Sequence, residues 1–182
     1  MKRVLLAAIA AFALAENASA SVFTIGTGVA SECYQAATAE RSDQAALRVC
    51  NLALDDQALM GRDRAATFVN RGIILLNRRE ASAALADFDA AIRLSARSGE
   101  AHVNRGAALI LMRDYSGAIA AITHGITLEP DDPHKAYFNR AIANEELGDL
   151  RAAYGDFRRA AELAPDWALV QRELSRYTVS TR

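Results

Sequence analysis

Three arginines are the residues of this chain whose type and spacing most readily suggest chemistry. Each lies in the same phrase, asparagine–arginine–glycine or alanine, which recurs after 34 and then 35 residues. Guanidinium groups at one position of successive units would form a column able to bind an anion or an acidic peptide. The alternative, which we favour, is that they pair with carboxylates of adjacent helices, such as Asp87 or Asp156, while their stems pack. The three copies are Asn70-Arg71-Gly72, Asn104-Arg105-Gly106 and Asn139-Arg140-Ala141.

Patterns for catalysis or metal binding are not found in the sequence. The histidines, His102, His124 and His134, lack a metal-ligand spacing such as H-E-x-x-H. The sequence has no glycine-rich phosphate loop, and no serine or cysteine beside a plausible base. We therefore predict a non-catalytic protein with no catalytic residues, no metal site and no cofactor. The net charge of −1 gives no basic footprint for nucleic acid, so no nucleic-acid partner is expected.

The chain has two cysteines, Cys33 and Cys50. An even number of cysteines behind an export signal favours a disulfide between them. Chain-entropy arguments assign a bond that closes a loop of this size about 3 kcal/mol. The alternative is that Cys50 is a small buried apolar residue and Cys33 has no special role.

Residues 1–20 have the organisation of a secretory signal peptide. Lys2 and Arg3 precede an apolar run over Val4–Ala15, and Ala18-Ser19-Ala20 matches a small-x-small cleavage site. The run is shorter than the about 20 residues that a membrane-spanning helix needs. We expect cleavage after Ala20, a periplasmic or secreted mature protein, and no stable membrane span after cleavage. The alternative is an uncleaved anchor or a helix of the fold.

A fixed period of this length indicates an array of units that bury their apolar faces only against one another. The alanine-rich, glycine-poor and proline-poor composition favours helix throughout. We expect three helical pairs, at about 65–77 with 81–94, 100–112 with 116–128, and 135–147 with 150–163. The expected division is a signal peptide at 1–20, an N-terminal arm at 21–42, a degenerate half-repeat and connection at 43–64, repeats at 65–98, 99–133 and 134–165, and a capping helix with its tail at 166–182.

These positions resemble the tetratricopeptide repeat (TPR), a helical hairpin of about 34 residues. Counted from Ala65, Gly99 and His134 as first residues, small residues recur where paired helices approach closely, and a large one fills the space beside them. The eighth positions are Gly72, Gly106 and Ala141, and the twenty-fourth are Phe88, Ile122 and Phe157. The resemblance implies an all-α TPR solenoid with a C-terminal capping helix, and no narrower subfamily. In the half-repeat, Cys50 falls at position twenty-four and the first helix cannot be recognised.

In TPR proteins the first helix of each pair lines a concave groove that receives peptides or partner helices. Carried over to this chain, most of these positions are apolar, and an exposed apolar strip would bind a hydrophobic or helical segment. The alternative is that the chain fills the groove itself, with Val22–Ile25 or the terminal helix. Together with Asn104, which falls on a clamp position, the groove residues are Val69, Ile73, Leu76, Asn77, Val103, Ile110, Lys135, Phe138 and Ile142.

A carboxylate clamp, as in co-chaperone TPR domains, is not expected. Asn104 and Lys135 fall on two clamp positions, but Val69, Ile73 and Asn139 stand where a cation, an amide and a cation are needed. The predicted function is a non-catalytic adaptor of the cell envelope that binds a protein or peptide partner in an apolar groove. In that case Ile110→Asp or Phe138→Asp should abolish capture of the partner protein and leave the helical content intact. The alternative is a self-associating structural protein, a homodimer formed through the terminal helix.

Overall fold

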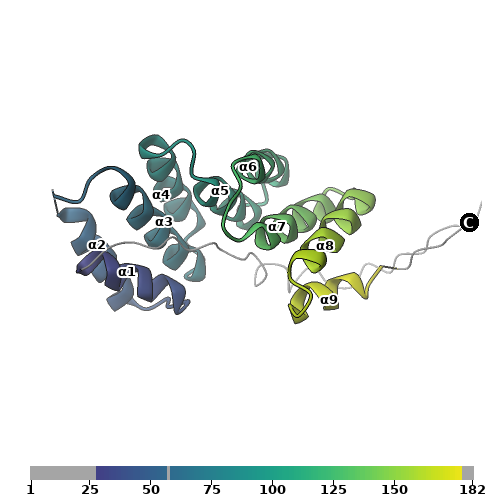
Figure 1. Cartoon of the computed structure of the whole chain (residues 1–182), viewed down its shortest axis with the longest axis horizontal. Coiled ribbons are helices and arrows are strands. Elements are labelled where there is room, and N and C mark those ends of the chain that lie inside the picture. The colour runs from purple at the N-terminus through teal and green to yellow at the C-terminus, as the bar shows by residue number, and fades with distance from the viewer. Residues whose placement is uncertain (1–27, 57, 178–182) are drawn as a thin grey trace, which may run out of the picture.

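A computed structural model describes residues 28–56 and 58–177, and within these ranges all regular structure is α-helical (Figure 1). Successive helices pair as hairpins, and the hairpins stack side by side into an elongated array (Figure 1). No helix in the described ranges is both long enough and apolar enough to cross a membrane. The helices are α1 (Val29–Thr38), α2 (Gln44–Asp55), α3 (Gly61–Asn77), α4 (Ala81–Leu94), α5 (Gly99–Leu111), α6 (Tyr115–Thr127), α7 (Pro133–Glu146), α8 (Leu150–Leu163) and α9 (Ala168–Leu174).

Each of the three regular hairpins turns in the same way. After α3, α5 and α7 one residue adopts a left-handed conformation: Arg79 at φ 65°, Arg113 at φ 63° and Gly148 at φ 81°. Two backbone bonds close the first of these turns, from Arg79 N to Leu76 O at 2.8 Å and from Glu80 N to Leu75 O at 2.9 Å. The other two turns repeat this Schellman pattern, which satisfies carbonyls at the helix end. The repeated turn therefore sets the same geometry in each hairpin.

Close approach of the paired helices explains the small residues at position eight. A Cβ atom added to Gly72 would lie 2.5 Å from Cε1 of Phe88, and one added to Gly106 would lie 2.3 Å from Cγ1 of Ile122. Phe88, Ile122 and the corresponding Phe157 are all fully buried. The large residue of the second helix thus packs directly on the backbone of the first, as the spacing predicted.

The N-terminal region differs from the expected arm and half-repeat. Residues 29–38 form α1, which packs against both α2 and α3, so α1 and α2 together form a complete hairpin. The sequence is compatible with a short helix over residues 30–40 but does not assign it to a repeat, because residues 39–43 link α1 to α2, whereas residues 78–80 join α3 to α4. A longer link shifts every earlier residue out of the 34-residue register. In addition, α3 begins at Gly61 rather than near Ala65.

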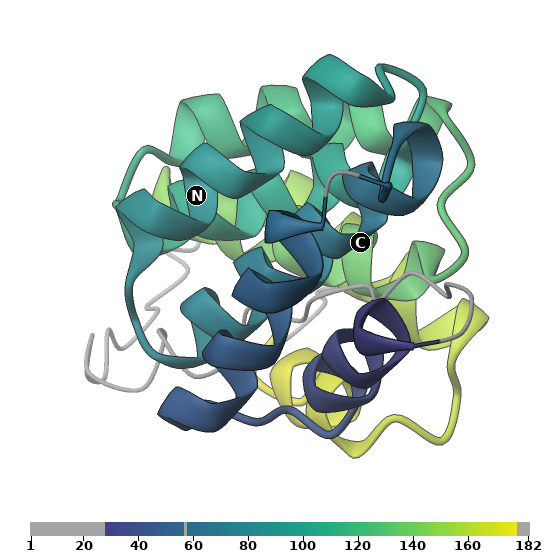
Figure 2. The ribbon, with the colours of Figure 1, turned by 90° about the vertical axis from the view of Figure 1, so that its left-hand side faces the viewer.

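The short helices α1 and α9 lie at opposite ends of the array but on the same side of it (Figures 1 and 2). Each packs against the neighbouring hairpin, α1 on α2 and α3, and α9 on α8. The buried apolar side chains form one large cluster around α1–α5 and another around α5–α9. The core therefore runs along the array instead of forming a single centre.

Candidate binding surface

The apolar groove residues are buried, contrary to the exposed strip expected from the sequence. Their exposed fractions range from 0 to 7%. Asn104 is also fully buried, so it cannot contact a partner in this conformation. Of the remaining two, Asn77 is exposed and Lys135 is half-buried, with its Nζ 2.9 Å from Oδ2 of Asp132. The buried apolar residues are Val69, Ile73, Leu76, Val103, Ile110, Phe138 and Ile142.

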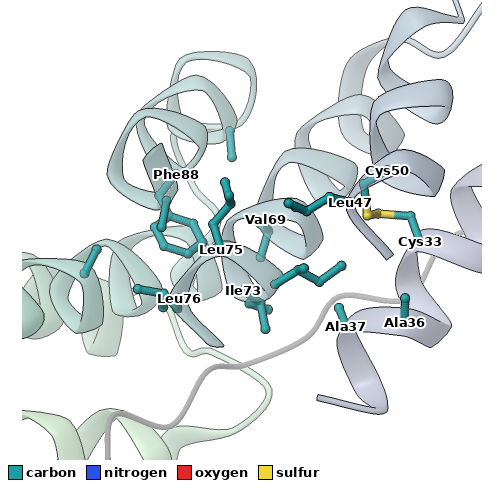
Figure 3. Packing of buried hydrophobic residues seen from close by; sticks show 14 of the residues in the cluster. Cys33, Ala36, Ala37, Leu47, Cys50, Val69, Ile73, Leu75, Leu76 and Phe88 are labelled. Carbon is teal, nitrogen blue, oxygen red and sulfur yellow. A yellow bond between two sulfur atoms is a disulfide. The ribbon is translucent and has the colours of Figure 1, made fainter. Parts of the chain in front are cut away.

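At one end of the array α1 packs on these positions. Ala36 and Ala37 of α1 belong to the same buried cluster as Val69 and Ile73 of α3, and Figure 3 shows Ala37 facing the α3 side chains. The chain's own helix thus covers the inner side of the first regular repeat. The chain thus covers part of this face itself, but with α1, which is neither of the segments named from the sequence. Of those, Val22–Ile25 lies outside the described residues.

At the other end the terminal segment packs against α7. The rings of Phe138 and Trp167 are 4.7 Å apart between centroids, and those of Phe138 and Phe157 are 5.4 Å apart. Tyr177 donates its hydroxyl hydrogen to Oε1 of Glu145 at 3.0 Å. Burial, and then the Glu145 carboxylate, raise the pKa of Tyr177 well above its usual value. This packing supplies an apolar and a polar contact to the last repeat.

The position of Phe138 corrects one proposed test of the groove. A Phe138→Asp change would place a carboxylate among aromatic rings in a fully buried site. Burying an unpaired carboxylate costs several kcal/mol or forces its protonation. The variant would therefore lose its fold before it reported on partner binding, and the same reasoning applies to Ile110→Asp.

Accessible side chains lie one position beyond the buried row, at position thirteen of each repeat. Asn77 and Glu146 are exposed there, and Leu111 between them is half-buried. An amide, an apolar side chain and a carboxylate thus follow one another across α3, α5 and α7. A partner that approaches this side of the array meets these residues before it meets the buried row.

Each arginine of the column pairs with a carboxylate of a neighbouring helix, and two of the three do so within their own hairpin. Arg71 donates to both carboxylate oxygens of Asp87 at 2.8 and 2.7 Å, and Arg140 donates to both oxygens of Asp156 at 2.8 Å. These hydrogen bonds raise the pKa of each guanidinium. The aspartates are those named from the sequence, so the structural interpretation is confirmed for these pairs. Bidentate pairs of this kind fix the position of one helix on the next.

Arg105, the middle member, pairs differently. Its counterpart sixteen residues later is Ala121, which has no carboxylate. Arg105 instead donates from Nε to Oδ1 of Asp89 at 2.8 Å, which lies on α4 of the preceding repeat. Both side chains of this pair are more than a third exposed, so solvent screens it. The pair links two hairpins, whereas the other two pairs act within one hairpin.

The histidines occupy two separate places. The rings of His102 and His124 meet edge to face at 4.4 Å, and the ring of His134 meets that of Trp167 in the same way at 5.2 Å. Burial lowers the pKa of His102. Within residues 28–56 and 58–177 there is no cluster of three or more histidine, cysteine or carboxylate residues that could hold a metal.

Cys33 and Cys50 are joined in the structure, with Cα atoms 4.8 Å apart (Figure 3). Both residues are fully buried between α1 and α2. The sulfur atoms therefore lie in the large N-terminal cluster together with Leu47 and Ile73.

The disulfide leads to a direct chemical prediction. Mass spectrometry of the protein digested without reductant should show a peptide containing Cys33 linked to one containing Cys50. After reduction the linked mass should disappear and two alkylated peptides should replace it. Quantitative alkylation of both cysteines in the unreduced, denatured protein would contradict the prediction.

Comparison with known proteins places the repeats in a wider group. The family model described as tetratricopeptide repeat matches residues 134–166. The peptidyl-prolyl cis-trans isomerase FKBP42 of Arabidopsis thaliana is 41% identical over 73 residues, which are 40% of this chain and 20% of that protein. The chain therefore spans about a fifth of the length of that relative.

Solved structures extend the comparison to 60–82% of the chain. The second TPR domain of human RPAP3, in complex with the HSP70 peptide SGPTIEEVD, is 25% identical, with a TM-score of 0.55 over 60% of this chain and 90% of that one. The crystal structure of MamA is 17% identical, with a TM-score of 0.64 over 82% of each chain. At that identity the likeness to MamA concerns the fold alone.

Proposed function

Because this chain belongs to the tetratricopeptide repeat proteins, we propose that it is a non-catalytic adaptor that binds a peptide or helix of another protein. The observation that carries the proposal is the stack of equivalent first helices α3, α5 and α7, in the same fold as a domain solved with a bound peptide. A solenoid of this type presents an extended surface, which suits an extended or helical ligand.

The expected ligand differs from a peptide held by its C-terminal carboxylate. Such a ligand needs convergent cations and amides. Here Val69 and Ile73 occupy two of the positions in question, and Asn104 is buried. We therefore expect a partner that offers an apolar side chain to Leu111 and polar groups to Asn77 and Glu146.

Export to the cell envelope is the second part of the proposal. The disulfide between Cys33 and Cys50 supports it, because such bonds persist in oxidising compartments. The signal-like segment 1–20 and its cleavage after Ala20 lie outside the described residues. A periplasmic or secreted location would bring the adaptor together with partners of the envelope.

Self-association through the terminal helix is the weaker alternative. Trp167 and Tyr177, which flank the terminal helix and could form a dimer face, pack on Phe138 and Glu145 of the same chain. A dimer built on them would first have to replace these contacts. Light scattering of the mature protein separates the alternatives, since a monomer at all concentrations is expected for the adaptor.

Site-specific crosslinking in the native cell tests the binding surface. A photoreactive residue at Asn77 is expected to form an adduct with one envelope protein, because this exposed side chain borders the buried row. Ser82, exposed on α4, is the control position and should not form that adduct. In the Asn77 background, Leu111→Asp should reduce the adduct at least tenfold.

Two outcomes would reject the proposed surface. One is the same adduct at Ser82 and Asn77, which would indicate random collision. The other is an Asn77 adduct that persists undiminished in the Leu111→Asp variant, which would place the contact elsewhere on the array. Circular dichroism of each variant should match that of the unmodified protein.

A further inference from the structure

The first hairpin lacks the large side chain that joins the helices of the other three. Gly72, Gly106 and Ala141 each lie five residues before the last residue of their helix, and Cys33 lies five residues before Thr38, where α1 ends. Cys50 stands at the position of Phe88. The disulfide therefore occupies the place where Phe88 packs on Gly72 in the next hairpin.

Apart from the disulfide, α1 is held on α2 and α3 by packing of small side chains. Its buried side chains are all small: Ala30, Cys33, Ala36 and Ala37. A helix of 10 residues is marginal in water by itself and depends on packing for its stability. Small side chains bury little apolar area, so they contribute little to holding α1 on the array. We therefore expect the covalent bond to be the strongest single constraint on this helix.

Both sulfur atoms are inaccessible once α1 has docked, since Cys33 and Cys50 have no exposed surface. Thiol–disulfide exchange needs direct attack of one sulfur on another, and so it needs access. An oxidant can therefore reach the two thiols only while α1 is undocked. The reduced chain with a loose α1 must precede the oxidised chain with a docked one.

We propose that Cys33 and Cys50 form a redox latch that closes α1 over Val69 and Ile73 of α3. The two thiols react with a protein or small-molecule disulfide: one Cys33–Cys50 bond forms and the oxidant's S–S bond breaks. Two electrons and two protons pass to the oxidant, which leaves as two thiols. Because the new bond is buried, the latch resists reductant while the fold is intact.

The latch regulates the surface proposed above, and its biological meaning rests on that proposed function. In the reduced chain the inner side of α3 is open, and an apolar helix can contact Val69 and Ile73 there. In the oxidised chain α1 packs on α3, and Ala36 and Ala37 belong to the same buried cluster as Val69 and Ile73 (Figure 3). Oxidation thus removes the α3 part of the binding surface and leaves the parts on α5 and α7.

Hydrogen exchange of the purified mature chain tests the latch without any partner. The oxidised protein is compared with protein refolded in dithiothreitol and with a Cys33→Ala/Cys50→Ala variant. Amides of α1 are expected to exchange on the order of 100-fold faster in the reduced protein and in the double-alanine variant than in the oxidised protein. This factor corresponds to the free energy that a disulfide closing a loop of this length contributes. Amides of α5 and α7 should keep their rates.

A dye provides the second measurement. The fluorescence of 1-anilinonaphthalene-8-sulfonate, a probe of exposed apolar surface, should rise in the reduced chain and in the double variant. Equal protection of α1 in all three forms would overturn the latch, because packing alone would then hold the helix. Loss of protection in α5 and α7 to the same extent as in α1 would also overturn it, because the bond would then support the whole array.

Discussion

Replacement of Phe88 by alanine is expected to lower the free energy of unfolding by about 3–5 kcal/mol, the usual cost of removing a large core aromatic. Phe88 is fully buried and packs on the backbone of Gly72 at the crossing of α3 and α4. No other side chain can fill the space, because the facing position is a glycine. Urea unfolding followed by circular dichroism measures the change.

The matched control is Leu94→Ala, at the end of the same helix. Leu94 is exposed, so its truncation should change the free energy of unfolding by less than about 1 kcal/mol. Similar losses for Phe88→Ala and Leu94→Ala would show that the crossing is not a centre of stability.

A double variant isolates the contact itself. Gly72→Ala alone should destabilise the protein by about 1–3 kcal/mol, because the new methyl group overlaps the Phe88 ring. In the Phe88→Ala background the same change should be neutral or stabilising, since the overlap is gone and alanine favours helix over glycine by about 1 kcal/mol. Additive effects would contradict the packing described here.

The second large effect is expected for Asp87→Ala, at about 2–4 kcal/mol. The change removes both carboxylate acceptors of Arg71 at the same crossing and leaves a mostly buried guanidinium with only its hydrogen bond from Nη1 to Oδ1 of Asn51. Removing one partner of a buried ion pair costs more than the pair itself contributes, because the remaining charge is still desolvated. Thermal and urea unfolding of the variant provide the measurement.

Asp89→Ala is the control for this prediction, two residues further along α4. Asp89 makes one hydrogen bond to Arg105, and both side chains are more than a third exposed. Exposed pairs contribute about 0–1 kcal/mol, so this variant should remain close to the unmodified protein. If the Asp89→Ala variant were the less stable of the two, burial would not be the property that decides the value of these pairs.

The internal design of each hairpin could be predicted from the sequence. The small residue at Gly72, the large one at Phe88 and the pairing of Arg71 with Asp87 all follow from residues that recur at fixed distances. A repeat preserves such distances because each pair of helices must solve the same packing problem with its own residues. The helical class followed for the same reason.

Departures from the repeat could not be predicted in this way. The longer link at residues 39–43 hid α1 from a count based on period. Arg105 turned to Asp89 of the preceding hairpin because Ala121 offers no carboxylate. Each of these outcomes depends on which neighbour lies within reach in space, and spacing along the chain does not specify that.

Burial of the groove residues was likewise decided by the tertiary structure alone. The sequence marked Val69, Ile73 and Phe138 as apolar positions of one face, and this identification of the face is what periodicity can determine. Whether such a face meets solvent, a partner or the chain itself depends on helices outside the repeat. Here Val103 lies against Gly125 and Phe138 packs on Phe157 within their own hairpins. At the ends of the array α1 and Trp167 add contacts that have no period and arise only once the array has folded.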